Sequence, residues 1–232
     1  MKKTSYAHLI KFLRDERNLA QVQVAKHTNM SRASYVAVEK GTKELTLAEA
    51  SSLTKLFGIT LDALLETEAP NIARYQQMLL AYLREAKKSK QSIKKTKLAK
   101  LLYIADFSWY YLTNKSMSGI QYRRGEFGPV ADVYFRLLDD LEQNGTITIK
   151  QIYRDDYHMY EIEETRGSNK KSLSLLSAKE LKHIEKIWLA WAGASTAEIV
   201  KFTVEQNPFQ TAIPNEIISY ASIRDEASHM IF

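Results

Sequence analysis

The chain contains no cysteine, and its 232 residues include only eight glycines and four prolines. The absence of cysteine excludes disulfide bonds, thiolate catalysis and cysteine-ligated zinc, and it fits the reducing cytoplasm in which we expect the protein. So few glycines and prolines argue against an all-β sandwich, which needs frequent turns. No apolar run reaches the roughly 18 residues that cross a bilayer, and charges interrupt the N-terminal apolar segment. We therefore expect neither a membrane span nor a signal peptide.

The charges are distributed unevenly along the chain, although the overall net charge is only +6. Residues 69–115 carry ten basic and two acidic residues, a net charge of +8, whereas residues 116–232 have a net charge of −4. A basic middle segment is typical of a protein with a polyanionic or acidic partner. Lysines that only keep helix faces solvated would give the same composition, so the charges leave both interpretations open.

Apolar spacing and helix-end signals predict five short helices in the first 66 residues. Asn29 tolerates the left-handed conformation of a tight turn, and Ser31 can cap the helix that follows it. Gly41 is expected to end that helix. Thr46 begins the next helix with a capping box, and Gly58 ends it.

A polar segment with a proline, residues 66–70, follows the fifth helix, which we expect to begin at Thr60. We therefore divide the chain into domains of residues 1–68 and 69–232. In the second domain, helical patterns begin at Ile72 and Leu98.

A third helical stripe in the second domain, residues 130–141, follows Pro129, which suits a first helical position. Alternating apolar residues on either side of Arg154 predict a β-hairpin, and capping boxes at Ser177 and Ser195 predict two further helices. The expected fold class is mainly α: a five-helix N-terminal domain, then a mostly helical domain with a small β-hairpin.

Residues 21–41 have the length and pattern of two short helices joined by a tight turn, the unit that places its second helix in the DNA major groove. Arg32 can pair with guanine or hold a phosphate, and nearby polar side chains can contact base edges or the backbone. We expect Glu39 to pair within the domain, because a carboxylate is repelled by phosphates. The predicted DNA-binding residues are Gln21, Ser31, Arg32, Ser34, Tyr35, Lys40 and Lys43.

Residues 19–65 resemble the Cro/repressor-type (Xre-like) helix-turn-helix domain. Ala20 departs from the family's usual Thr or Ser cap, Asn29 stands where Gly is common, and Leu45 stands where Pro is common. None of these departures prevents a helix from entering the groove. The matching positions are Gln21, Ala25, Ser31, Glu39, Gly41, Leu47, Leu53, Leu56, Gly58, Ile59 and the run from Leu61 to Leu65.

The second domain resembles the Panacea (SocA-like) antitoxin domain over about residues 70–220. The resemblance rests on the KLAKLLYIA helix at residues 97–105, the Gly-Pro-Val arm at 128–130, and the Val-Tyr pair at 133–134. In the closing segment, Val204 and Phe209 replace the family's usual His and Trp. Lys94-Lys95 stands where Thr-Pro is common. The resemblance implies that this domain neutralises a toxin by direct binding, while a fused repressor domain controls the shared operon.

The arm before the third helix carries residue types that are enriched in interface hot spots, Arg and aromatics. We therefore take Arg123, Arg124, Phe127 and Tyr103 as candidate toxin contacts. The alternative for the same residues is that the aromatic rings are core and the two arginines are solvated.

The sequence gives no sign of an enzyme, a metal site or a cofactor. The five histidines lie far apart, without the HExxH spacing of a zinc site. A GxSxG turn and a glycine-rich phosphate loop are both missing. Asp139 and Asp140 are neighbours on a helix and point about 100° apart, so they cannot share one proton.

The preferred hypothesis is therefore a type II antitoxin that binds its cognate toxin and represses its own operon. Its expected partners are the toxin from the neighbouring gene, double-stranded operator DNA and a second copy of itself, because one domain of this kind recognises only a few base pairs. Two alternatives stay open. One is a repressor from a phage or mobile element, with a C-terminal sensor or oligomerisation domain. The other is an adaptor that delivers a toxin to a protease.

Overall fold

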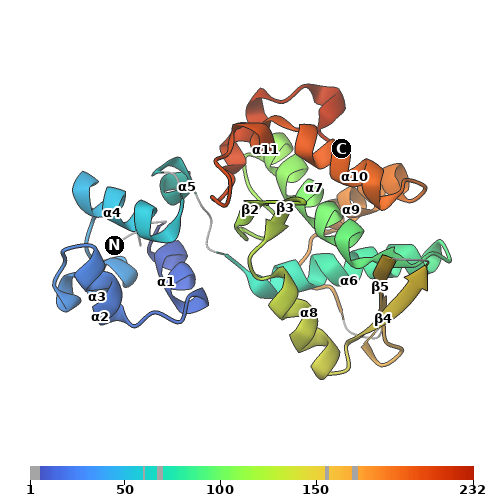
Figure 1. Cartoon of the computed structure of the whole chain (residues 1–232), viewed down its shortest axis with the longest axis horizontal. Helices are drawn as coiled ribbons and strands as arrows, with labels where there is room; N and C mark the ends of the chain where they lie inside the picture. The colour runs from blue at the N-terminus through green and yellow to red at the C-terminus, as the bar shows by residue number, and fades with distance from the viewer. Residues whose placement is uncertain (1–5, 60, 67–69, 155–156, 169–171) are drawn as a thin grey trace.

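The computed structural model describes residues 6–59, 61–66, 70–154, 157–168 and 172–232 (Figure 1). A small helical N-terminal part lies beside a larger part that holds the strands and the longer helices. Two separate clusters of buried apolar residues form the cores of these parts. The mainly α fold class is confirmed. The predicted boundary between residues 68 and 69, and the predicted helix start at Thr60, lie outside the described residues.

The N-terminal part contains the five predicted helices. Ser31 caps α3 by accepting a hydrogen bond from the Ser34 backbone N–H at 3.0 Å. Asn29 and Gly58 adopt the predicted left-handed conformation, with φ of 54° and 55°. The helices are α1 (Tyr6–Glu16), α2 (Gln21–His27), α3 (Arg32–Glu39), α4 (Leu47–Phe57) and α5 (Leu61–Glu66).

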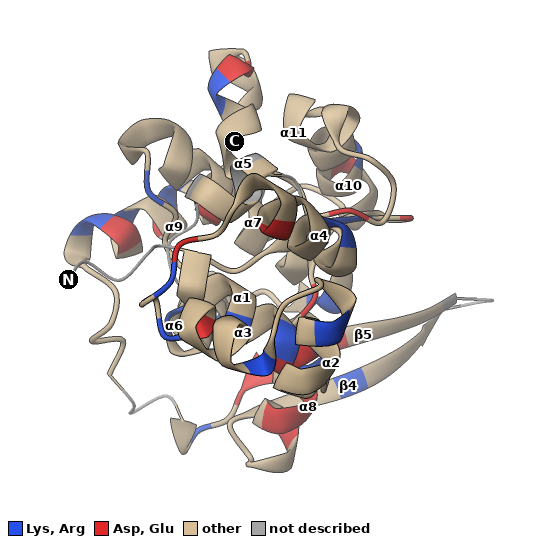
Figure 2. Cartoon of the chain, turned by 90° about the vertical axis from the view of Figure 1, so that its left-hand side faces the viewer, with Lys and Arg blue, Asp and Glu red and all other residues tan. Residues whose placement is uncertain are grey.

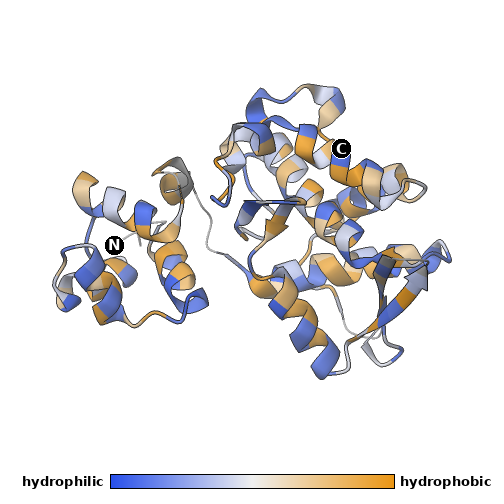
Figure 3. Cartoon of the chain, in the orientation of Figure 1, coloured by the Kyte–Doolittle hydropathy of each residue, from blue (hydrophilic) through white to orange (hydrophobic). Residues whose placement is uncertain are grey.

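The second part is built around α7 (Lys95–Thr113), most of whose residues are buried. Capping boxes at Ser177 and Ser195 begin α9 and α10, as the sequence predicts. Figure 3 shows the apolar and polar sides of α8. The other helices of this part are α6 (Ile72–Lys88), α8 (Tyr134–Gln143), α9 (Ala178–Trp191), α10 (Thr196–Glu205) and α11 (Asn207–Thr211), with short 3-10 helices η2 (Tyr220–Asp225) and η3 (Ser228–Met230).

The predicted β-hairpin is present as β4 (Ile147–Arg154) and β5 (Tyr157–Glu164). A short strand, β1 (Ile93–Lys94), extends it on the β5 side, with Ile93 opposite Ile162. The turn residues Asp155 and Asp156 lie outside the described part of the chain. The β1 strand was not predicted, because two residues are too few to give an alternating pattern.

The prediction that Pro129 begins a helix is wrong. Residues Gly128–Ala131 form β3, which pairs antiparallel with β2 (Tyr122–Gly125), and α8 begins only at Tyr134. Gly125 lies opposite Gly128, so two residues form the turn, and Gly128 has a φ of 92° that disfavours any larger residue. Strand pairing therefore overrides the local preference of proline for a helix start.

A buried carboxyl group fixes the loop before β2 onto α7. Asp106 accepts hydrogen bonds from the Ser118 N–H at 2.8 Å, the Ser118 hydroxyl at 2.5 Å and the Tyr122 hydroxyl at 2.8 Å. Burial raises the pKa of Asp106 to about 6, although these hydrogen bonds oppose the rise. The rings of Tyr103, Phe107 and Tyr220 pack around Tyr122.

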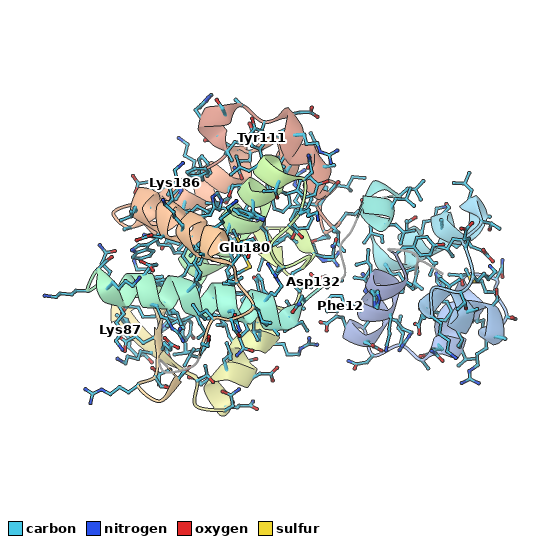
Figure 4. The ribbon with its side chains drawn as sticks, turned by 180° about the vertical axis from the view of Figure 1, so that it is seen from behind. Phe12, Lys87, Tyr111, Asp132, Glu180 and Lys186 are labelled. Carbon is cyan, nitrogen blue, oxygen red and sulfur yellow. The ribbon has the colours of Figure 1, made fainter. Side chains whose placement is uncertain are left out.

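The two parts meet through the segment before η2 and through α1. The Ile217 N–H donates to the Gly58 carbonyl at 3.1 Å, and its side chain, 1% exposed, belongs to the N-terminal core. Arg136 of α8 pairs with Glu16 of α1 at 2.5 Å. Figure 4 shows Phe12 and Asp132 near this boundary, where they help to line a cavity of about 290 Å³.

The basic stretch of residues 87–100 does not extend the surface of the N-terminal helices. Lys87 lies at the end of α6 farthest from them (Figure 4). Lys97 and Lys100 are buried against the second part. None of the helices in the described ranges has the length and apolarity that a membrane span requires.

Candidate nucleic-acid interface and partner-binding groove

The first turn of α3 is open to solvent. Ser31 and Arg32 are exposed, Ser34 is half-buried, and basic segments of α2 and α3 lie on the face turned to the viewer in Figure 2. In the described part of the chain, no ion pair joins Arg32 to a carboxylate. The guanidinium is therefore available to a phosphate or to a guanine edge.

A hydrogen-bonded cluster behind α3 holds the two helices of the motif together. Glu39 accepts hydrogen bonds from Arg14 of α1 and from the Gln21 amide of α2, the latter at 2.8 Å. Burial alone would raise the pKa of Glu39, but these hydrogen bonds outweigh it and lower the pKa. The expectation that Glu39 pairs inside the domain is met. Gln21 donates one of its two amide protons to Glu39, and its contact with a DNA phosphate stays a prediction.

The prediction that Tyr35 contacts DNA is wrong in this conformation. Its side chain is fully buried in the N-terminal core, and burial raises the pKa of its hydroxyl far above the usual range. Tyr35 lies three residues after Arg32, but the helix turns its side chain toward α1 rather than toward solvent. An aromatic residue at this spacing is therefore a core residue of the motif.

The two predicted lysines at the end of α3 differ in their surroundings. Lys40 is exposed, whereas the Lys43 ammonium pairs with Glu49, with distances of 2.6 and 2.8 Å to the carboxylate oxygens. Lys26, in the last turn of α2, is also exposed and was not predicted. Lys26 could have been predicted from its position, because it is a basic residue at the end of the first helix of the motif.

The candidate toxin contacts on the β2–β3 hairpin divide into paired and free side chains. Arg123 pairs with Asp132 at 2.6 and 2.8 Å, and Arg124 donates to the Ala212 carbonyl at 2.5 Å and lies over the ring of Phe209. Phe127, in the turn, is 72% exposed. Of the three hairpin candidates, Phe127 is therefore the one whose side chain is exposed and not bonded within the described part of the chain.

The prediction that Tyr103 contacts a toxin is wrong in this conformation. Its ring is fully buried and packs against Phe107 and Tyr122 in the centre of the second core. Burial raises the pKa of its hydroxyl well above the usual range. Tyr103 therefore supports the hairpin from behind and does not reach the surface.

A groove of about 870 Å³ lies beside the exposed Phe127. Its floor is the first two turns of α7, including Ala99 and Lys100, and its walls are the β2–β3 hairpin and the first turn of α10. Phe135, at the start of α8, and His158, near the start of β5, also line the groove. Segments that lie more than 100 residues apart in the chain, such as those of Lys95 and Val200, thus line one depression.

Lys100 is the charged residue at the base of this groove. Only 3% of it is exposed, and its ammonium donates to the Pro129 carbonyl at 2.8 Å. Burial lowers the pKa of Lys100 to about 7. A Cβ atom at Gly128 would lie 3.0 Å from this ammonium, so the glycine lets the hairpin close over the lysine. The sequence placed Lys100 only within the basic segment of residues 69–115 and did not single it out, although a lysine among apolar helix positions was a signal for its burial.

The described residues offer no site for a metal ion. Among them, no group of three or more His, Asp or Glu side chains is arranged to hold one. His183 bonds to the Ser108 hydroxyl at 2.7 Å, and burial lowers its pKa to about 4. This histidine is accordingly a neutral packing residue of α9.

Comparisons with known protein families agree with the two-part architecture. A helix-turn-helix family model matches residues 10–64, which span most of α1 to α5. The family model described as antitoxin SocA-like, Panacea domain matches residues 98–210, from α7 to α11. The searches of curated proteins and of solved structures gave no significant match. The chain therefore carries a helix-turn-helix domain followed by a SocA-like Panacea domain.

Proposed function

We propose that this protein is the antitoxin of a type II toxin–antitoxin system, which binds the toxin encoded by its neighbouring gene and represses their shared operon. The observation that carries the proposal is the presence, in one chain, of a helix-turn-helix domain and a SocA-like Panacea domain. Both activities are binding events, and we propose that the protein catalyses no reaction.

The DNA-binding part of the proposal is supported by the open first turn of α3. Arg32 is exposed in this turn, and Lys26 at the end of α2 and Lys40 at the end of α3 are exposed as well. One such motif recognises only a few base pairs, so we propose that two copies bind a near-palindromic operator with half-sites one helical turn apart. Leu61 and Leu65, four residues apart on α5, are 37% and 54% exposed and offer apolar surface for a second copy.

The toxin-binding part is supported by the second domain. The β2–β3 hairpin presents Phe127 to solvent beside the groove of about 870 Å³. Exposed aromatic side chains next to a depression are typical of protein interfaces. The hairpin is also firmly held, because Arg123 and Arg124 are bonded within the chain. A rigid surface loses little conformational entropy on binding.

The proposal is tested by expressing the neighbouring gene with and without this chain. We expect the neighbour alone to stop growth, the wild-type chain to restore it, and the two proteins to copurify. Arg32→Ala should weaken operator binding and keep neutralisation.

Other outcomes separate the alternatives. A harmless neighbour contradicts the antitoxin proposal and favours a repressor with a sensor domain. Rescue that requires a cellular protease, with falling toxin levels, favours the adaptor. A monomer on operator DNA, measured by sedimentation, contradicts the dimer.

A further inference from the structure

The groove beside the hairpin combines a largely apolar lining with one buried cation. Ala99, Val130 and Val200 contribute to its lining, and Lys100 lies at its base. Glu126, Lys95, His158 and Tyr134 are the other charged or titratable residues that line it. The volume, about 870 Å³, falls within the range of roughly 300–1,000 Å³ that is usual for binding sites.

Among the described residues, no carboxylate pairs with the Lys100 ammonium. Its one hydrogen bond, to the Pro129 carbonyl, uses one of three protons, and the described residues supply no carboxylate for the others. Burial is the cause of its lowered pKa. A buried cation is costly unless it is paired. A ligand carboxylate would supply the missing partner.

A second polar group in the same groove is also unsatisfied. The Thr196 hydroxyl, in the first turn of α10, is buried and has no hydrogen-bond partner among the described residues. Buried polar atoms are paired in most native structures, so an orphan hydroxyl in a groove points to a partner that comes from outside. Lys100 and Thr196 come from two different helices and line one depression.

The rim of the groove favours a protein segment over a small molecule. Phe127 and Phe135 are 72% and 52% exposed, and both line the groove. Lys95 lies over the Phe135 ring, with its ammonium 5.1 Å from the ring centre. Exposed aromatic side chains at a rim extend the contact area beyond what a small ligand covers.

We infer that this groove binds an apolar segment of the toxin that carries a carboxylate, with the carboxylate on Lys100 and Thr196 and the apolar side chains against Phe127 and Phe135. The inference rests on the proposed antitoxin function and names the chemistry that its partner presents. Glu126 at the rim repels a second negative charge, so the segment carries its carboxylate toward the base of the groove. One buried ammonium matches one carboxylate better than a dianionic phosphate.

The test compares three variants for binding to the purified product of the neighbouring gene. Lys100→Met removes the charge and keeps an unbranched side chain of similar length. Lys97→Met is the matched control, because Lys97 lies one turn earlier on α7, is also buried, and donates instead to the Ala192 and Ala194 carbonyls. Phe127→Ser changes an exposed turn residue, so it tests the rim even if a buried substitution lowers stability. Titration calorimetry measures affinity, and operator binding reports that each variant is folded.

We expect Lys100→Met to bind the toxin at least tenfold more weakly, Phe127→Ser several-fold more weakly, and Lys97→Met within about twofold of wild type. A double-mutant cycle, with each Asp and Glu of the toxin changed to its amide, should find one carboxylate coupled to Lys100. Normal binding by both Lys100→Met and Phe127→Ser overturns the inference but leaves the proposed function intact. A loss without any coupled carboxylate overturns the assigned chemistry. Failure of the wild-type chain to bind removes the proposed function as well.

Discussion

Arg32 at the start of α3 and Arg123 in β2 occupy opposite kinds of surroundings. Arg32 is exposed, whereas Arg123 is half-buried, pairs with Asp132 and also donates to the Asn215 carbonyl. A free guanidinium can turn to an incoming phosphate without losing a bond. A paired one must first give up its ion pair, so its exchange for a new contact gains little. In the N-terminal domain, Arg32 is therefore available to a ligand. In the second domain, Arg123 and Arg124 stabilise the β2–β3 hairpin.

The same contrast extends to the residues around each arginine. The open surface of α3 depends on helices that are adjacent in the sequence. The hairpin depends on contacts from α7, α10 and the segment before η2. We therefore expect substitutions near the hairpin to change stability first, and substitutions near α3 to change DNA affinity first.

The largest effect is expected for Asp106→Ala, which removes the carboxyl group that fixes the loop before β2. Three donors, from Ser118 and Tyr122, would be left buried without this acceptor. The free energy of unfolding should fall by about 3 kcal/mol, because unpaired buried donors are costly. Urea denaturation measures the change, with Asp139→Ala on the exposed side of α8 as control. Equal stability of the two variants would show that the hairpin does not depend on this anchor.

The second effect is on DNA binding. Arg32→Ala should weaken operator binding by about 1–3 kcal/mol at fixed salt, and it should leave the unfolding midpoint unchanged because Arg32 is exposed. Fluorescence anisotropy with a labelled operator measures the affinity. Lys55→Ala, an exposed lysine on α4, serves as a control for the loss of one positive charge. An unchanged titration for Arg32→Ala would remove this residue from the interface.

The buried ammonium of Lys100 predicts a pH dependence of stability. Its folded-state pKa is lowered to about 7, from an ordinary value of 10.5, so between these values the unfolded chain binds more protons than the folded chain. Wild-type stability should therefore gain about 1.4 kcal/mol per pH unit from this group as pH rises, and Lys100→Met should lack that gain. The comparison is made by urea denaturation at pH 8 and pH 9. Lys201→Met, on the exposed face of α10, should titrate like wild type.

The sequence predicts best those features that depend on residues close together in the chain. The five N-terminal helices and the turn at Asn29 were predicted, because capping residues and left-handed positions act within a few residues. Tyr35 was wrongly assigned, because its burial depends on packing against α1 and not on its place in α3. Pro129 was wrongly assigned to a helix. The prediction considered only the residues that follow Pro129, whereas its strand pairs with the preceding strand at Arg124.

The groove could not have been predicted from residue patterns. Lys100, Phe127 and Thr196 are separated by 27 and 69 residues, and only the tertiary fold brings them to one depression. The resemblance to the Panacea domain marked the segments that contain Lys100 and the hairpin, but it did not show which side chains face outward. Tertiary packing determines which side chains face outward: Tyr103 is fully buried, whereas Phe127 is 72% exposed.

The smallest effect is expected for Arg123→Ala, and it reverses the pattern of Arg32→Ala. Loss of the ion pair with Asp132 should lower the free energy of unfolding by about 1 kcal/mol, because this pair is partly solvated. Operator affinity should stay within twofold, since Arg123 contacts no residue of α3. Urea denaturation and operator titration are made on the same preparation, with Asp132→Asn as the partner variant. If Arg123→Ala weakens DNA binding as much as Arg32→Ala, the hairpin and α3 are coupled through Ile217 and Gly58, whose hydrogen bond joins the two domains.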